Sequence, residues 1–245
     1  MYAGDNHTIN IISGDNSYIY GDTVIEDSGA ILMTLNGTNS RWDMVGDSTV
    51  TNLMLNGSTL NFMPGSTQNS NLSRNYVRFK TLRVTGDYHG SDSNIVMNTQ
   101  LGDDNSPTDR LIVDGNTSGT TNVKVVNVGG GGGYTINGIE LITVGGNSDG
   151  EFRQDGRIVA GAYDYTLQRG EDQKANNWYL SNKLPLQSEP QPAPEPQTPG
   201  TPPIPKPVPR EYAVRPGAGL YGLNLQAANT LFNTRLHDRL GETHY

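Results

Sequence analysis

The sequence predicts an all-β fold in which short strands stack into a β-solenoid, followed by a proline-rich linker and a single C-terminal α-helix. Three observations support this prediction. Only 33% of the 245 residues are hydrophobic and 30 are glycine, which suits the narrow core of a stacked β fold better than a compact globular domain. Short β-prone runs recur between turn residues along most of the chain. The last part of the chain changes first to dense proline and then to helical spacing.

Disorder is the first alternative, because low hydrophobicity favours it. Disordered chains, however, usually combine high charge with few β-branched or aromatic residues. Here only 17% of the residues are charged, while Val, Ile, Thr and Tyr are plentiful. The composition therefore favours short strands over disorder.

The first zone, residues 1–184, alternates β-prone runs with Gly, Asn and Asp, which favour turns. This alternation is typical of many short strands. In its first half the runs are residues 9–12, 18–20, 24–25, 31–35, 53–55 and 60–63.

Turn motifs in this zone recur. The Leu-Asn-Gly-Thr of residues 35–38 returns twenty positions later as the Leu-Asn-Gly-Ser of residues 55–58, and the Gly-Asp-Asn of residues 4–6 returns at 14–16. A period of about twenty residues is one coil in many β-solenoids. The alternative is coincidence, because Asn-Gly is a common hairpin turn. We prefer the solenoid.

A second section begins near Phe79. Residues 81–90 resemble residues 110–119, since both alternate apolar residues before a glycine turn. These runs are expected to be successive rungs. Further strands are expected at residues 122–128, 139–144, 157–159, 163–167 and 178–180. We expect the best-packed part here, because it gathers large aromatic side chains, namely Phe152, Tyr163, Tyr165, Trp178 and Tyr179.

Residues 185–216 are predicted to be a linker. Ten prolines lie between Pro190 and Pro209, and proline at that density favours an extended polyproline II spacer. Pro202 and Pro205 also satisfy a PxxP ligand pattern, although a spacer is the simpler use.

Residues 217–245 are predicted to contain a helix, because apolar residues keep helical spacing from Gly219 to Gly241. At about 1.5 Å per residue its length approaches the hydrocarbon thickness of a bilayer. Its many polar residues, such as Asn224, Asn233 and Asp238, do not suit contact with lipid. Such a helix would cross a membrane only inside a polar lumen.

Charge and composition exclude several classes of function. The net charge is -8 without a Lys or Arg cluster, which argues against a nucleic-acid partner and against anionic membranes. The absence of cysteine excludes disulfides and thiolate sites. No apolar stretch reaches the roughly 20 residues of a transmembrane helix, and the first residues do not have the features of a signal peptide.

Two pairs of carboxylates are candidates for acid and base in a glycosidase or polysaccharide lyase, namely Asp43 with Asp47 and Asp103 with Asp104. Their glycine-rich surroundings favour a role in turns instead. An enzyme of this kind is the alternative function, and the preferred prediction is a protein without catalytic activity.

Metal and cofactor sites are not predicted. His7, His89, His237 and His244 lack metal-ligand spacing, and the Asp-rich turns match no calcium loop. The run Gly129–Gly133 lacks the Lys and Ser or Thr of a phosphate-binding loop. We expect it to be a flexible turn between rungs.

Several segments resemble the C-terminal passenger region of bacterial autotransporters of the pertactin and AIDA type. Their order and spacing match the family over roughly residues 81–241. The matching segments are residues 101–111, 113–119, 150–152, 157–163, 177–180, 215–216 and 236–241.

The resemblance implies a right-handed parallel β-helix with rungs at residues 1–78 and an autochaperone segment at residues 79–184 that forms its C-terminal end. The linker, residues 185–216, would then lead to a helix in the pore of an outer-membrane β-barrel, the implied partner. The chain stops where that barrel should follow, so we expect a processed or truncated form of a longer protein. Some relatives cleave themselves between paired asparagines, whereas here Asn229 precedes Thr230.

The resemblance further implies a type V secreted passenger, exported through the periplasm to the bacterial cell surface. We expect residues 79–184 to be the stable folding nucleus and residues 1–74 to be weaker solenoid, a stalk for an adhesin-like protein. Seven acidic residues accompany Arg41 and Arg74 in that weaker part. Its polar wall would suit glycans, cations or a like passenger as partners, but solubility explains it equally well.

Overall fold

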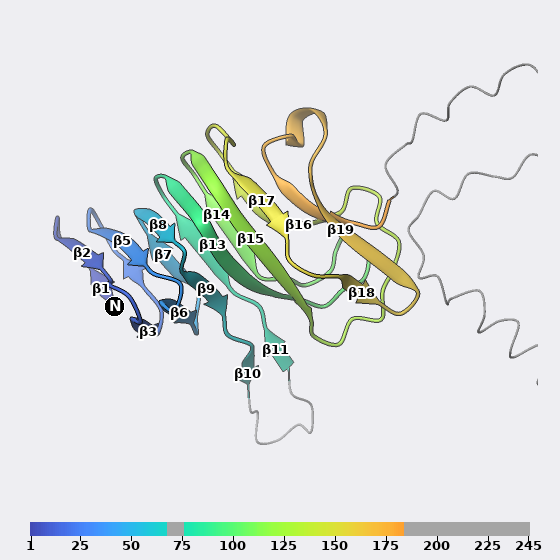
Figure 1. The fold of residues 1–245 in the computed structure, drawn as a ribbon, viewed down its shortest axis with the longest axis horizontal. Helices are drawn as coiled ribbons and strands as arrows, with labels where there is room; N and C mark the ends of the chain where they lie inside the picture. Colours follow the sequence, from blue (N-terminus) through green and yellow to red (C-terminus); the bar gives the residue numbers. More distant parts are fainter. Residues whose placement is uncertain (68–75, 184–245) are drawn as a thin grey trace, which may run out of the picture. The chain divides into compact units, whose positions relative to one another are not determined.

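The computed structural model describes residues 1–67 and 76–183. Apart from one short 3-10 helix, their regular structure is β-strand, stacked in chain order from the blue β1 to the orange β19 in Figure 1. The all-β prediction is thus confirmed for this part of the chain. The predicted linker at residues 185–216 and the predicted helix at residues 217–245 lie outside the described residues.

Parallel ladders build the stack, because each coil lays its strands beside those of the coil before it. The first ladder comprises β2 (Thr8–Ile12), β5 (Ala30–Asn36), β8 (Asn52–Asn56) and the first halves of β13 (Tyr88–Thr99) and β15 (Thr117–Asn127). The second comprises β3 (Tyr18–Tyr20), β6 (Arg41–Met44), β9 (Thr59–Phe62), the second halves of β13 and β15, and β17 (Glu151–Gln154).

The third side of the coils has shorter strands. They are the pair β1 (Tyr2–Ala3) and β4 (Val24–Ile25), followed by the ladder of β7 (Ser48–Val50), β12 (Thr81–Val84), β14 (Arg110–Val113) and β16 (Ile139–Val144). Between β9 and β12 the chain leaves the stack as an antiparallel pair, β10 (Gly65–Thr67) and β11 (Tyr76–Arg78). This curled arrangement of parallel strands is consistent with the predicted β-solenoid, and its right-handedness stays a prediction.

The pairing register confirms two of the sequence repeats. Leu35 faces Leu55 and Asn36 faces Asn56 on neighbouring coils, so the twenty-residue repeat is a true coil period. Residues 81–84 likewise face residues 110–113. Like residues therefore stack at one position of successive coils, which keeps the apolar column continuous.

The Gly-Asp-Asn motifs do not follow the coil period. Residues 4–6 and 14–16 flank β2 and form two corners of the same coil. Asp5, Asn6 and Asn16 there have φ values of 48°, 60° and 59°, and Asp and Asn tolerate this left-handed region better than most residues. The motif marks tight corners.

Inward-facing side chains form a single hydrophobic core through the stack. In the first coil Ile9, Ile11 and Ile19 are only partly buried, because a neighbouring coil covers them on one side only. From β5 onward the inward residues are fully or almost fully buried, among them Ile31, Leu35, Trp42, Leu60, Leu82, Leu111 and Leu141.

The last strands close the stack with antiparallel pairing, which the sequence analysis did not predict. β18 (Ile158–Ala160) pairs with β19 (Tyr163–Arg169), and β19 pairs with β20 (Trp178–Ser181). β20 then pairs antiparallel with β16. The reason is connection length: only two residues join β18 to β19, and a parallel pair would need a crossover of a dozen or more.

Candidate functional site

The antiparallel end of the stack, residues 133–182, is the candidate site and is called the cap below. Tyr165 on β19 fixes it to the preceding coil. Its hydroxyl donates to the Gly102 carbonyl oxygen at 2.7 Å and accepts from the Gly133 N–H at 2.9 Å. Burial raises the pKa of Tyr165, so the hydroxyl keeps the proton it donates. One side chain thus joins three segments far apart in sequence.

Asn182 makes a second link. Its Nδ2 donates to the Gly133 carbonyl oxygen at 2.5 Å, and its Oδ1 accepts from the Thr135 N–H at 3.1 Å. The Asn182 N–H in turn donates to Thr135 Oγ1 at 3.0 Å. Thr135 and Asn182 are fully buried, so these bonds satisfy polar groups that would otherwise be costly to bury.

An aromatic column runs from β13 into the cap. The Tyr88 and Phe152 rings stack with centroids 5.7 Å apart, and the edge-on rings of Phe152 and Trp178 are 5.5 Å apart. The Arg169 guanidinium lies 4.5 Å from the Trp178 ring centroid and donates to Ser148 Oγ and the Gly150 carbonyl oxygen. The expected packing of aromatics in this region is therefore present, and it extends to Tyr88.

Asp104 orders the segment that leads into β16. Its carboxylate accepts from the N–H groups of Ile136, Asn137 and Gly138 at 2.9, 2.9 and 3.0 Å. Burial alone would raise the pKa of Asp104, but these hydrogen bonds outweigh it and lower the pKa. Its neighbour Asp103 instead accepts the Asn105 N–H within its own turn.

The five-glycine run that leads into the cap is ordered near its end, so the expected flexible turn is wrong for at least two of its members. Gly132 N–H donates to the Leu101 carbonyl oxygen at 2.9 Å, and Gly133 is bound by Tyr165 and Asn182. A Cβ on Gly132 would lie 2.3 Å from the Ala160 carbonyl oxygen. Only glycine allows these backbones to approach so closely.

The other candidate carboxylates have separate structural partners. Asp43 lies in strand β6, not in a turn, and accepts from Tyr18, Arg41 and Asn61. Burial would raise the pKa of Asp43, but these hydrogen bonds lower it. Asp47 accepts from the Thr81 N–H and pairs with the exposed Arg78. Asp43 and Asp47 thus each bind residues of neighbouring coils and help to hold the stack together.

A cavity of about 590 Å³ lies beside the short 3-10 helix η1 (Asp172–Lys174) of the cap. None of the four candidate aspartates lines it. Its walls mix both charge signs, with Arg169 and Lys174 beside Glu171. The cavity therefore lacks the excess of one charge sign that would attract an oppositely charged substrate.

The histidines within the described residues lie apart. His7 is exposed and contacts the Gly4 carbonyl oxygen, whereas His89 is half-buried and contacts Ser118 Oγ. Residues 1–67 and 76–183 hold no cluster of three His, Cys, Asp or Glu residues suited to a metal ion. His237 and His244 lie outside these ranges.

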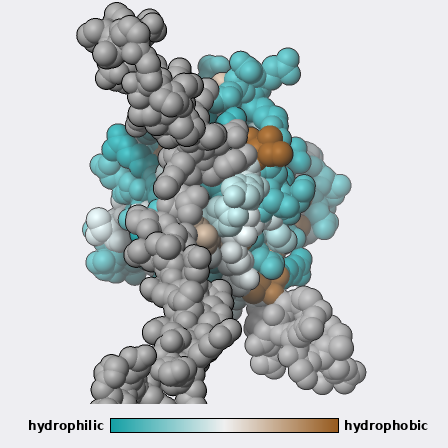
Figure 2. Space-filling model, turned by 90° about the vertical axis from the view of Figure 1, so that its right-hand side faces the viewer, coloured by the Kyte–Doolittle hydropathy of each residue, from teal (hydrophilic) through white to brown (hydrophobic). Residues whose placement is uncertain are grey.

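The exposed surface around the cap end is largely hydrophilic. Figure 2 views the structure from this side and shows only small hydrophobic patches among the atoms that are not grey. Within the described ranges, no helix has the length and apolarity needed to cross a membrane.

Comparison with known proteins gives these features a family. Residues 48–167 match the family model described as Autochaperone Domain Type 1. The chain carries the autochaperone region of an autotransporter passenger. The matched residues begin at β7 and end within β19, and the predicted start at Phe79 stays a prediction.

Relatives of the autochaperone region include adhesins. The chain is 49% identical to the uncharacterized protein YdeU of Escherichia coli over 166 residues, which is 67% of this chain and 34% of that protein. It is 41% identical to the autotransporter adhesin AIDA-I of Escherichia coli over 65% of this chain and 11% of that protein. It is 36% identical to the adhesin BmaC autotransporter of Brucella suis over 80% of this chain and 6% of that protein. The chain thus spans about a third of these relatives or less.

Sequence reasoning located the aromatics of the autochaperone region but not its polar links. Asp104, Thr135 and Asn182 are common turn or loop residues, and each acts on a segment at least 30 residues away. The alternation of residues in a sequence shows only which side chains share a face of one strand, so no local pattern identifies these three residues.

Proposed function

We propose that the cap is a folding nucleus and that residues 1–78 are a stalk in the passenger of a type V secreted autotransporter. Autochaperone segments are by description aids to folding, and the cap has the structure that such a role requires. Tyr165 and the aromatic column join it to earlier coils, and Asn182 links its first and last residues.

The observation that carries the proposal is the asymmetry of the two ends. At the cap end, antiparallel β20 occupies the edge of β16. At the other end of the described residues, β2 and β3 each pair with one neighbour only. The occupied edge of β16 prevents growth of its ladder, although β17 at this end pairs only with β15. The open parallel edges of β2 and β3 can template the next strand. Growth of the stack therefore runs from the cap toward the N-terminus.

Such directional folding suits export without nucleotide energy. A chain that emerges C-terminal part first is retained outside if its first segment folds stably, because folding removes the form that can slip back. In this proposal the partner is an outer-membrane β-barrel, and the passenger is displayed at the bacterial cell surface. Two relatives are named adhesins, which supports a binding role over catalysis.

The two tryptophans of the chain allow a direct test. Trp178 lies in the cap and Trp42 lies in the stalk, and both are buried. In the variant Trp42→Phe the tryptophan fluorescence comes from Trp178 alone, and in Trp178→Phe it comes from Trp42 alone. After dilution from urea, stopped-flow fluorescence should show the Trp178 signal returning before the Trp42 signal.

The two variants control for each other because each makes the same substitution. Circular dichroism would first confirm that both regain the wild-type β spectrum. A Trp42 signal that returns first, or at the same rate, would contradict a nucleus in the cap.

A further inference from the structure

The outer side of β3 presents two exposed aromatic rings. Tyr18 and Tyr20 lie on the same side of the strand, because side chains two apart share a face. They are 61% and 64% exposed. Their ring centroids are 6.5 Å apart and the ring planes are inclined by 39°. Together they form one small aromatic surface, called the tyrosine platform below.

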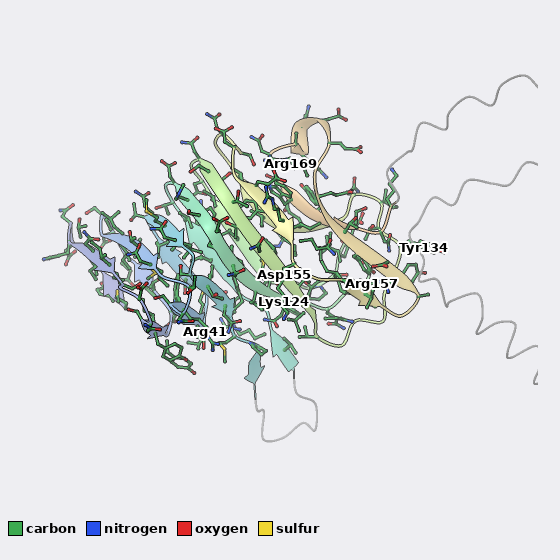
Figure 3. All side chains as sticks on the ribbon, in the orientation of Figure 1. Arg41, Lys124, Tyr134, Asp155, Arg157 and Arg169 are labelled. Carbon is green, nitrogen blue, oxygen red and sulfur yellow. The ribbon has the colours of Figure 1, made fainter. Side chains whose placement is uncertain are left out.

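Polar groups of the next coil border the tyrosine platform. The register places Arg41 beside Tyr18 and Asp43 beside Tyr20. The Tyr18 hydroxyl donates to Asp43 Oδ2 at 2.9 Å, and the Arg41 guanidinium lies 5.8 Å from the Tyr18 ring centroid. These contacts fix the Tyr18 ring, while the Arg41 side chain stays 48% exposed. Figure 3 marks Arg41 near the lower edge of the blue part of the stack.

The tyrosine platform is not part of the hydrophobic core. Ile19, between the two tyrosines, packs against the core, and its register partner Trp42 is fully buried. Coils of a solenoid stack along the hydrogen-bonding direction, whereas side chains project across it. A further coil beside β3 would therefore pair with its backbone and leave the outward side of the rings open.

We propose that the tyrosine platform binds a neutral pyranose sugar at the end of a glycan. The C–H face of a pyranose packs on an aromatic ring, while its hydroxyl groups need polar partners at the rim. Tyr18 and Tyr20 supply the rings. Arg41 and the amide of Asn61, both bound to Asp43, supply the rim.

Charge distinguishes neutral from acidic sugars. The positive charge of Arg41 is paired with Asp43, so the site has no free cation for a sugar carboxylate. Residues 1–74 carry seven acidic residues against two arginines, and their field repels anions. A neutral sugar is therefore the ligand that the site fits.

A protein partner fits less well. Stable protein interfaces bury about 1,000 Å² or more around an apolar centre. The tyrosine platform is two rings within a polar wall that includes Arg41, Thr59 and Asn61. Its size matches one or two sugar units. The proposal depends on display of the stalk at the cell surface for its biological use, but not on the cap as a folding nucleus.

The test uses saturation-transfer NMR on the full chain with four probes: lactose, maltotriose, diacetylchitobiose and 3′-sialyllactose. We expect transfer to the pyranose C–H protons of at least one neutral probe and a weaker signal with the sialylated one. Tyr20→Thr removes a ring but keeps a strand-forming residue. It should weaken binding roughly two- to tenfold, the usual worth of one aromatic contact.

Two variants serve as controls. Tyr20→Phe keeps the ring and should bind within about twofold of wild type. Tyr2→Thr removes an equally exposed tyrosine from β1, another side of the coil, and should leave binding unchanged. Circular dichroism confirms that each variant is folded, and the tryptophan refolding order tests the cap separately.

Four results would overturn the proposal. They are no binding of any neutral probe, binding of 3′-sialyllactose alone, equal binding by Tyr20→Thr and wild type, and a wild-type dimer in light scattering that Tyr20→Thr converts to a monomer. The last would assign the tyrosine platform to a second copy of the chain.

Discussion

At the scale of single residues, two buried or half-buried aspartates stabilise the cap and its neighbouring coil in opposite pH ranges. Asp104 has a lowered pKa because backbone N–H groups bind its charged form. Asp109 is fully buried, and burial raises its pKa despite hydrogen bonds from the N–H groups of Lys80 and Asn98. A lowered carboxyl pKa favours folding at neutral pH, and a raised one favours it in acid.

Asp104→Ala should lower the free energy of unfolding by about 1–3 kcal/mol at pH 7, because three backbone N–H groups lose their acceptor. The contribution of Asp104 is present above the carboxyl pKa of the unfolded chain and is lost as pH falls through the lower folded pKa. The deficit should therefore shrink below about pH 4. Urea unfolding at pH 7 and pH 3 measures it.

Asp103→Ala is the matched control, because its carboxylate accepts only the Asn105 N–H among the hydrogen bonds described. It should cost less than Asp104→Ala at pH 7. Equal losses would mean that the links to residues 136–138 contribute nothing to stability.

Asp109→Asn should show the opposite trend. The variant loses an acceptor for buried donors, so we expect a deficit of at least about 1 kcal/mol near pH 4. Because the folded pKa of Asp109 is raised, wild-type stability falls as pH rises from the unfolded pKa through the folded one. The deficit of the non-titrating variant should thus shrink toward pH 7. Urea unfolding across this range would contradict the raised pKa if the deficit grew instead.

At the scale of elements, the five-glycine run before β16 behaves as a shaped segment. Gly129 and Gly132 both have positive φ, 94° and 83°. A Cβ on Gly129 would meet nothing within 4 Å, whereas on Gly132 it would strike Ala160 and Tyr163 at 2.3 and 2.6 Å. Substitutions at the two glycines therefore separate the stability cost of the left-handed backbone conformation from the cost of a steric clash.

Gly129→Ala should cost about 1–2 kcal/mol, since only the left-handed conformation opposes it. Gly132→Ala should cost clearly more, because backbone must also move apart. Thermal unfolding followed by circular dichroism compares them. A similar melting temperature for the two variants would indicate that the backbone around Gly132 moves apart easily.

The predictability of the elements follows from how their residues are spaced. The rungs at residues 81–84 and 110–113 were predicted because stacked positions repeat the same residue types. The antiparallel pairing of β20 with β16 was not predicted, since the residue pattern of a strand does not show whether it runs parallel or antiparallel to its neighbour. The role of the glycine run was also hidden, because glycine permits both flexible and tightly packed backbones. The tyrosine platform was missed because alternation alone does not tell the inner side of β3 from the outer.

At the scale of the whole described stack, the core of the first coil is less buried than that of the coils after it. The inward Ile9, Ile11 and Ile19 are only partly buried, whereas Ile139, Leu141 and Leu180 are buried. In a stack each coil is stabilised mainly by its neighbours, so a coil with one neighbour opens most easily. Local stability should therefore be lowest in the first coil.

Hydrogen exchange followed by mass spectrometry should therefore show fast exchange in β2 and β3 and slow exchange in β14, β16 and β20. Tyr165→Phe, which removes the hydroxyl that binds Gly102 and Gly133, should speed exchange in β16 and β20. Exchange in β2 should not change, because the coils of β5, β8, β13 and β15 separate it from Tyr165 and open ends fray independently. Protection of β2 equal to that of β16 would show instead that the stack opens only as one unit, which would remove the difference in stability between its two ends on which cap-first folding depends.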